Sequence, residues 1–144
     1  MIQFDNVYKT YGRGQDALKN VSFTIDEGEF VFLTGHSGAG KSTLLRLVAL
    51  IEAASRGQVI VDGRNLDRIR PAEVPFYRRR IGFIFQEHRL LPDRSVFDNV
   101  ALPLVVAGHR STEINKRVRA ALDKVGLLSK ERTSPRTLSS GEQQ

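Results

Sequence analysis

The feature that most constrains this 144-residue chain is a glycine-rich segment that starts at Gly35 and ends at Ser42. It reads Gly-His-Ser-Gly-Ala-Gly-Lys-Ser and satisfies the pattern G-x-x-x-x-G-K-[ST] in full. The apolar run at residues 30–33 precedes it, and the apolar-rich segment 42–52 follows it. This context is typical of a phosphate-binding loop between a buried strand and a helix, so the segment predicts a nucleotide-binding α/β fold.

Phosphate binding explains the residue types in this loop. Gly35, Gly38 and Gly40 let the backbone approach a polyphosphate closely, and the positive start of the following helix faces the same anion. Lys41 supplies a mobile charge for the β- and γ-phosphates, and the Ser42 hydroxyl is expected to reach Mg²⁺. The expected nucleotide-binding set also contains the remaining loop positions and the residue after the loop: His36, Ser37, Ala39 and Thr43.

The remainder of the chain is expected to form one domain of strands and helices. Asp62-Gly63 is a strong signal for a tight turn, and Ser95 with Asp98 has the spacing of a helix-capping box. Strands are expected within residues 2–25 and at 59–61 and 81–85, and helices at 71–80, from Ser95 onward, and at 114–125 before Gly126.

Composition excludes several classes of site. The chain has no cysteine, and its three histidines show no ligand spacing, so a disulfide framework and a thiolate metal site are excluded. No apolar run approaches the roughly 20 residues of a membrane span. The net charge of +6 is spread along the chain without interleaved aromatic residues, so no nucleic-acid partner is expected.

Two further motifs follow the phosphate loop. Gln86 stands directly after the expected strand 81–85, and residues 138–144 read Leu-Ser-Ser-Gly-Glu-Gln-Gln. With these motifs the chain resembles the ATP-binding-cassette (ABC) family over its whole length. In residues 35–43, in Glu73-Val74-Pro75-Phe76 and in Asp98-Asn99-Val100-Ala101, it looks most like the cell-division branch of that family. The resemblance implies an incomplete nucleotide-binding domain: an antiparallel β region at 1–30, part of a RecA-like parallel sheet at 31–86, and a helical subdomain at 87–144.

The resemblance also implies roles for single residues. Tyr11 would stack on the adenine, and Gln86 would position Mg²⁺ and the attacking water, acting with Lys41 in catalysis. The motif at the end of the chain would contact the γ-phosphate held by a second copy, so that a homodimer encloses two ATP molecules. Ser140 stands where a second glycine is common in the family. The motif residues concerned are Ser139, Ser140, Gly141, Glu142 and Gln143.

The family resemblance further implies ATP and Mg²⁺ as cofactors and an integral membrane subunit as partner. The protein would then be peripheral, on the cytoplasmic face of the inner membrane. Residues 1–144 include neither the family's strand ending in Asp-Glu nor its histidine switch, so this stretch is expected to bind Mg-ATP without efficient hydrolysis. The alternatives are an ATPase subunit of a lipoprotein-release or macrolide-type exporter, a non-hydrolysing nucleotide-binding module, and a phosphate-loop protein acting on nucleic acid. Four candidate contacts to the membrane subunit are Leu90, Leu91, Pro92 and Phe97.

Overall fold

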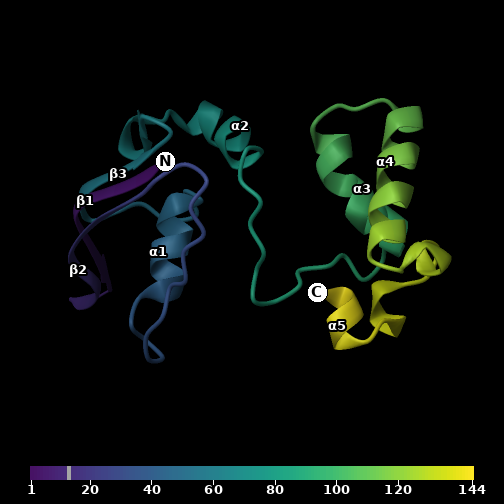
Figure 1. The fold of residues 1–144 in the computed structure, drawn as a ribbon, viewed down its shortest axis with the longest axis horizontal. Coiled ribbons are helices and arrows are strands. Elements are labelled where there is room, and N and C mark those ends of the chain that lie inside the picture. Colours follow the sequence, from purple (N-terminus) through teal and green to yellow (C-terminus); the bar gives the residue numbers. More distant parts are fainter. Residues whose placement is uncertain (13) are drawn as a thin grey trace. The chain divides into compact units, whose positions relative to one another are not determined.

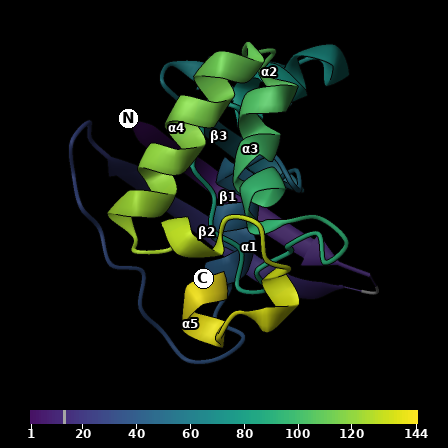
Figure 2. The ribbon, with the colours of Figure 1, turned by 90° about the vertical axis from the view of Figure 1, so that its right-hand side faces the viewer.

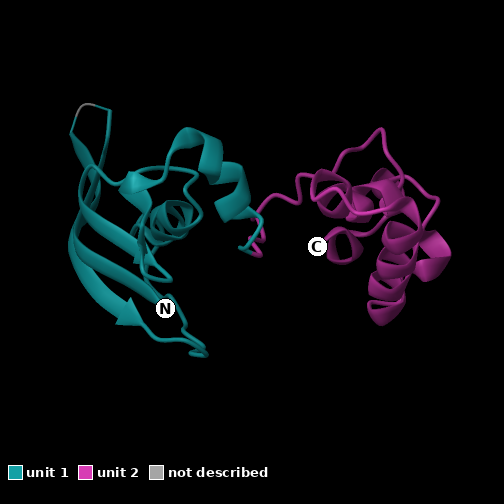
Figure 3. Cartoon of the chain, turned by 90° about the horizontal axis from the view of Figure 1, so that it is seen from above, with its two compact units in different colours: residues 1–81 teal, residues 82–144 magenta. Residues whose placement is uncertain are grey.

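The computed structural model describes residues 1–12 and 14–144, and these form two compact units (Figure 3). Unit 1 contains residues 1–81, and unit 2 contains residues 82–144. Each unit has a hydrophobic core of its own. The predicted three-part division at residues 30 and 86 remains a prediction. Among the described residues, no helix is long and apolar enough to cross a membrane.

Unit 1 is built on a four-stranded antiparallel sheet with strand order β2-β1-β3-β4 (Figure 1). On β1, Phe4 is opposite Phe23 of β2 and Val59 of β3, and the two phenylalanine rings stack with centroids 4.6 Å apart. The predicted antiparallel β region is therefore confirmed. The strands are β1 (Ile2–Tyr11), β2 (Gln15–Ile25), β3 (Arg56–Val61) and β4 (Arg64–Asn65).

Helix α1 (Lys41–Val48) packs on this sheet through one apolar face. Leu44 and Leu47 are buried in the core that contains Phe4 of β1, whereas Leu45 is exposed. The helix is shorter than the predicted 42–52 because the chain turns at Leu50, which has a positive φ of 52°. The later part of unit 1 contains three short helices: η1 (Leu66–Arg68), η2 (Pro71–Glu73) and α2 (Val74–Arg78).

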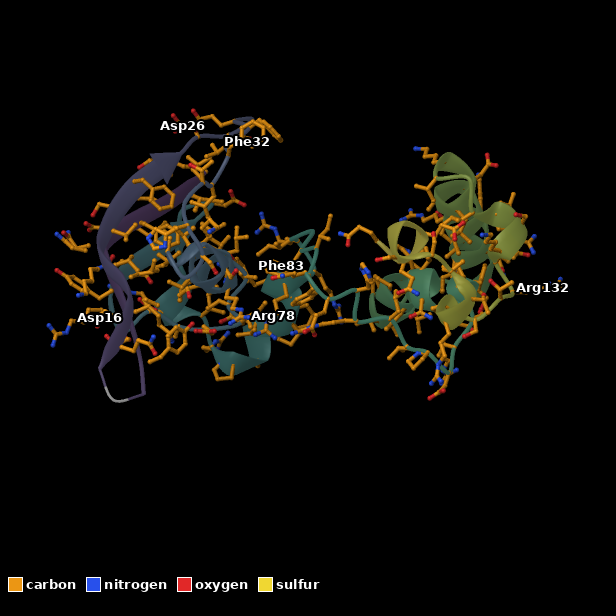
Figure 4. The ribbon with its side chains drawn as sticks, turned by 90° about the horizontal axis from the view of Figure 1, so that it is seen from below. Asp16, Asp26, Phe32, Arg78, Phe83 and Arg132 are labelled. Atoms are coloured by element: carbon orange, nitrogen blue, oxygen red, sulfur yellow. The ribbon has the colours of Figure 1, made fainter. Side chains whose placement is uncertain are left out.

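Helix α2 is tied to the end of α1 by two side chains. The buried Tyr77 donates its hydroxyl hydrogen to the Val48 carbonyl oxygen at 2.5 Å, and burial raises the pKa of this tyrosine to about 12. The Arg78 guanidinium, which Figure 4 labels, donates to the carbonyl oxygens of Ala49 and Leu50. These bonds satisfy carbonyl groups that the end of α1 leaves without helical partners.

The predicted strands at 30–33 and 81–85 are wrong in this structure. Both segments are irregular, and neither joins the four-stranded sheet. Phe30 is 83% exposed, Phe32 is 79% exposed and Ile84 is 79% exposed; Figure 4 shows Phe32 at the periphery of unit 1. A strand exists only where a neighbour accepts and donates its ladder hydrogen bonds, and no described residue does this for either segment.

Unit 2 is helical. Helices α3 (Val96–Val106) and α4 (Ser111–Lys124) lie side by side (Figures 1 and 2). The predicted capping box is confirmed, because the Ser95 hydroxyl accepts the Asp98 N–H at 3.1 Å and the Asp98 carboxylate accepts the Ser95 N–H at 3.2 Å. Gly126, with φ 72°, follows α4 as predicted. Three short helices complete the unit: η3 (Leu128–Lys130), η4 (Pro135–Thr137) and α5 (Ser140–Gln143).

Candidate nucleotide-binding site

The phosphate loop depends on glycine at two positions for different reasons. Gly38 has φ 82° with open space around it, so only its backbone conformation disfavours a side chain. Gly40 has φ 88°, and a Cβ there would lie 2.5 Å from the carbonyl oxygen of Ala17 and 2.8 Å from Cδ2 of Leu18. The loop is therefore packed directly against strand β2 at Gly40, and that contact fixes where helix α1 begins.

The first turn of α1 leaves donors available to a ligand. The N-cap is Gly40, so no side chain caps the helix, and the Leu44 N–H to Gly40 carbonyl bond at 2.9 Å is the first helical hydrogen bond. The N–H groups of Lys41, Ser42 and Thr43 precede it and have no acceptor within the helix. The first turn also carries no acidic residue. Together with the positive helix end, these donors suit a phosphate anion.

Lys41 is held across the loop. Its Nζ donates to the carbonyl oxygens of Gly35 and His36, both at 2.7 Å. The His36 ring nitrogen Nδ1 lies 2.8 Å from the Ser37 carbonyl oxygen, so this imidazole contacts the backbone of the loop. The main chain of the loop thus holds the ammonium group of the first residue of α1.

Tyr11 lies near the loop and is restrained at its hydroxyl and at one face. Its hydroxyl donates to Glu52 Oε2 and lies 3.5 Å from the hydroxyl oxygen of Thr43, which is buried. The Lys9 ammonium is 5.0 Å from the centroid of the Tyr11 ring and 3.4 Å from Glu52 Oε2. Sequence analysis identified Tyr11 and Thr43 but not Lys9 or Glu52. Those two belong to no motif, and their spacing along the chain carries no signal.

The motif at the end of the chain forms a capped helical turn. Ser139 is the N-cap of α5, and its N–H and hydroxyl both donate to Glu142 Oε2 at 2.9 and 3.0 Å. Hydrogen bonds from Lys130 and from Ser139 lower the pKa of Glu142 to about 2. Gln143 donates to the Leu138 carbonyl oxygen at 3.0 Å. Ser140 begins α5 without a positive φ, so its Cβ is compatible with the backbone here.

The predicted residues fall into two groups. The phosphate loop and Tyr11 belong to unit 1, whereas Gln86 and residues 138–144 belong to unit 2. A magnesium site shared by Ser42 and Gln86, and the contact of the motif with a second copy, therefore remain predictions. Both Ser42 and Gln86 are exposed. Within the described part of the chain, no group of three or more His, Cys, Asp or Glu side chains could hold a metal by itself.

Comparison with known proteins identifies the family. The family model described as "ABC transporter" matches residues 18–144. The chain is 55% identical over all 144 residues to the Cell division ATP-binding protein FtsE of Escherichia coli (strain K12), and it covers 65% of that protein. It is 48% identical to the Methionine import ATP-binding protein MetN 2 of Pseudomonas entomophila (strain L48), of which it covers 44%.

Comparison with a solved structure identifies the same family from the fold. The dimeric post-hydrolysis ATP-binding cassette MJ0796 bound to ADP and Pi is 36% identical, with a TM-score of 0.90 over 99% of this chain and 65% of that chain. The chain thus spans about 65% of the length of the FtsE relative and of the MJ0796 cassette. Its fold is that of part of an ABC ATPase domain, with an antiparallel sheet and helices. Taken with the phosphate loop, these matches show that the chain belongs to the ABC transporter family.

Proposed function

We propose that the chain is the nucleotide-binding part of an ABC-type ATPase subunit, which binds Mg-ATP and, at full length, couples hydrolysis to an integral membrane subunit. The observation that carries this proposal is the phosphate loop. Its glycines allow close approach of the backbone, the first-turn amides of α1 have no helical acceptors, and the Lys41 ammonium is held by two carbonyl groups of the loop. The similarity to MJ0796, whose structure is bound to ADP and Pi, supports a nucleotide as the ligand.

The residues of the loop fit a magnesium-bound triphosphate. Mg²⁺ commonly takes one or two protein oxygens and fills its other positions with water and phosphate oxygens, so a full protein cage is unnecessary. Ser42, exposed in the first turn of α1, offers one such oxygen beside the phosphate-binding amides. Gln86 is the proposed second group, and it would also orient the attacking water. Bound Mg²⁺ would supply charge neutralisation between the phosphates.

We propose a homodimer in which each copy's motif at 139–143 completes the other's nucleotide site. The dimeric MJ0796 structure is the support for this arrangement. In this proposal Lys41 binds the β- and γ-phosphates, while Ser139 and Gly141 present their donors to the γ-phosphate of the opposite copy. Hydrolysis is attributed to the full-length protein and binding to residues 1–144.

For the physiological role, we propose a cell-division ATPase of the FtsE type whose partner is an FtsX-like integral membrane subunit. The 55% identity to FtsE of Escherichia coli, against 48% to MetN 2, favours this role over a transporter role. The protein would then act at the cytoplasmic face of the inner membrane as a peripheral subunit. Leu90, Leu91, Pro92 and Phe97 are the proposed contacts to the membrane subunit. An ATPase subunit of an importer or exporter is the second candidate, favoured by the MetN 2 match.

Calorimetric titration of Mg-ATP into the full-length protein tests nucleotide binding. The wild type is expected to bind, and Lys41→Ala is expected to abolish detectable binding, because the variant loses the cation of the loop. Circular dichroism of both proteins controls for folding. A folded wild type that releases no binding heat with Mg-ATP would contradict the proposal.

Purification of the full-length protein from native membranes tests the partner. Recovery with an FtsX-type subunit is expected. The variant Leu91→Glu, at an exposed position, is expected to lose that partner while it still binds Mg-ATP. Recovery with only a lipoprotein-release, macrolide-export or methionine-import permease would overturn the cell-division role and leave nucleotide binding intact.

A further inference from the structure

We propose that Glu52 is a positioning residue for nucleotide binding, which fixes the Tyr11 ring for the base. This inference rests on the proposed function. Glu52 follows helix α1 and lies 41 positions from Tyr11 in sequence. The Tyr11 hydroxyl donates to its carboxylate and lies 3.5 Å from the Thr43 hydroxyl oxygen.

The Glu52 carboxylate is itself held by two cations from different elements. Lys9 of β1 lies 3.4 Å from Oε2, and Arg46 of α1 donates to Oε1 at 3.3 Å. Lys9 also donates to the Ala53 carbonyl oxygen at 2.8 Å. The side chains of Lys9 and Glu52 are only 15% and 19% exposed, so water screens this pair less than a surface pair. The carboxylate therefore has little freedom to move.

The protonation of Glu52 agrees with this geometry. Burial raises the pKa of its carboxyl group, but the hydrogen bonds from Tyr11 and Lys9 and the charge of Lys9 outweigh that effect, so the pKa lies below its usual value. Glu52 is thus an anion at neutral pH and accepts the Tyr11 hydroxyl with the added strength of a charged acceptor.

The contacts of Glu52 and Lys9 with Tyr11 determine which face of the ring can stack on a base. The hydroxyl is anchored at Glu52, and the Lys9 ammonium covers one face of the ring, so the opposite face is the one that can receive a flat base. A ring that is already fixed loses less conformational freedom on binding, which strengthens affinity without any new contact. The contacts of the Glu52 carboxylate are with Tyr11, Lys9 and Arg46, so its contribution should act through the Tyr11 ring and depend on the base.

A comparison of two ligands separates this role from general stabilisation. Mg-ATP and Mg-tripolyphosphate are titrated calorimetrically into full-length wild type and variants. Glu52→Ala is expected to weaken ATP binding about tenfold, the equivalent of one charged hydrogen bond, and to leave tripolyphosphate binding unchanged. Tyr11→Phe keeps the stacking face but loses the hydroxyl, so it should reproduce that pattern. The double variant should bind ATP no more weakly than either single variant.

Two further variants complete the experiment. Glu52→Gln retains an oxygen acceptor for Tyr11 and is expected to restore most of the ATP affinity. Glu73→Ala removes an ion-paired glutamate elsewhere in unit 1, which contacts Arg64 and Arg70, and is expected to bind both ligands as the wild type does. If Glu52→Ala does not fold, Tyr11→Phe still tests the base dependence.

Each outcome has a distinct meaning. Additive losses in the double variant, equal weakening of both ligands, or unchanged ATP binding in Tyr11→Phe and Glu52→Ala would overturn the role of Glu52. Failure of the folded wild type to bind either ligand would instead overturn the proposed function.

Discussion

Replacing Gly40 with alanine is expected to cost far more stability than replacing Gly38 with alanine, although both glycines have nearly the same φ, 88° and 82°. At Gly38 an added Cβ meets no atom within 4 Å, so the cost is the left-handed backbone alone, about 1–2 kcal/mol. At Gly40 the Cβ would lie 2.5 Å from the Ala17 carbonyl oxygen, so the backbone of the loop or of β2 would have to shift. Overpacking of this kind adds about 1–3 kcal/mol, for a total of about 2–5 kcal/mol.

Urea unfolding of the two variants measures this difference. For an m-value of about 2 kcal/mol/M, an extra 2 kcal/mol moves the midpoint of Gly40→Ala about 1 M below that of Gly38→Ala. Equal midpoints would refute the reasoning, because they would mean that strand β2 and the loop do not approach as closely as the structure has them. A changed m-value would point instead to an altered unfolded or native state.

Three further predictions concern unit 2. Ser95→Ala removes the cap of helix α3 and should lower the free energy of unfolding by about 1 kcal/mol in urea titrations; an unchanged midpoint would contradict the capping role. The hydrogen bond from Lys130 lowers the pKa of Glu142 from 4.5 to about 2, so the stability from this carboxylate is complete above pH 4.5 and is lost as the pH falls toward 2. Unfolding measured from pH 2 to 6 should show a shallower acid loss for Glu142→Gln, and identical slopes would refute this. Asn99→Ala removes bonds of 2.7 and 3.1 Å to the Leu91 N–H and carbonyl oxygen, so hydrogen exchange at Leu91 should accelerate at least tenfold, as expected for a loss of about 1.4 kcal/mol. Unchanged hydrogen-exchange protection at Leu91 would show that Asn99 does not stabilise the backbone there.

The parts of the fold that sequence predicted are those set by local physics. Asp62-Gly63 turns the chain from β3 to β4 with φ values of 47° and 74°, which is what a two-residue hairpin turn requires. The capping box of α3 and the buried face of α4, formed by Ile114, Val118 and Leu122, likewise follow from residues within a few positions of each other. Such features need no distant partner, so a single sequence determines them.

The expectations that failed depend on distant partners. The segment at 30–33 has the composition of a buried strand, yet Phe30 and Phe32 are largely exposed because no described strand pairs with it. Glu52 is the opposite case: it carries no sequence signal, yet it contacts Lys9 and Tyr11 of β1, the latter 41 positions away, and Arg46 of α1. Side-chain networks of this kind become visible only when the chain has been folded.

The Lys41 ammonium already has two carbonyl acceptors in its own loop, at 2.7 Å each. Any molecule that recruits this cation must offer stronger acceptors than the two that it displaces. Water or a lone monoanion gains little from such an exchange, whereas adjacent phosphoryl oxygens with several negative charges gain much. If the proposed function holds, these two internal contacts would favour a polyphosphate over a smaller anion, independently of the base.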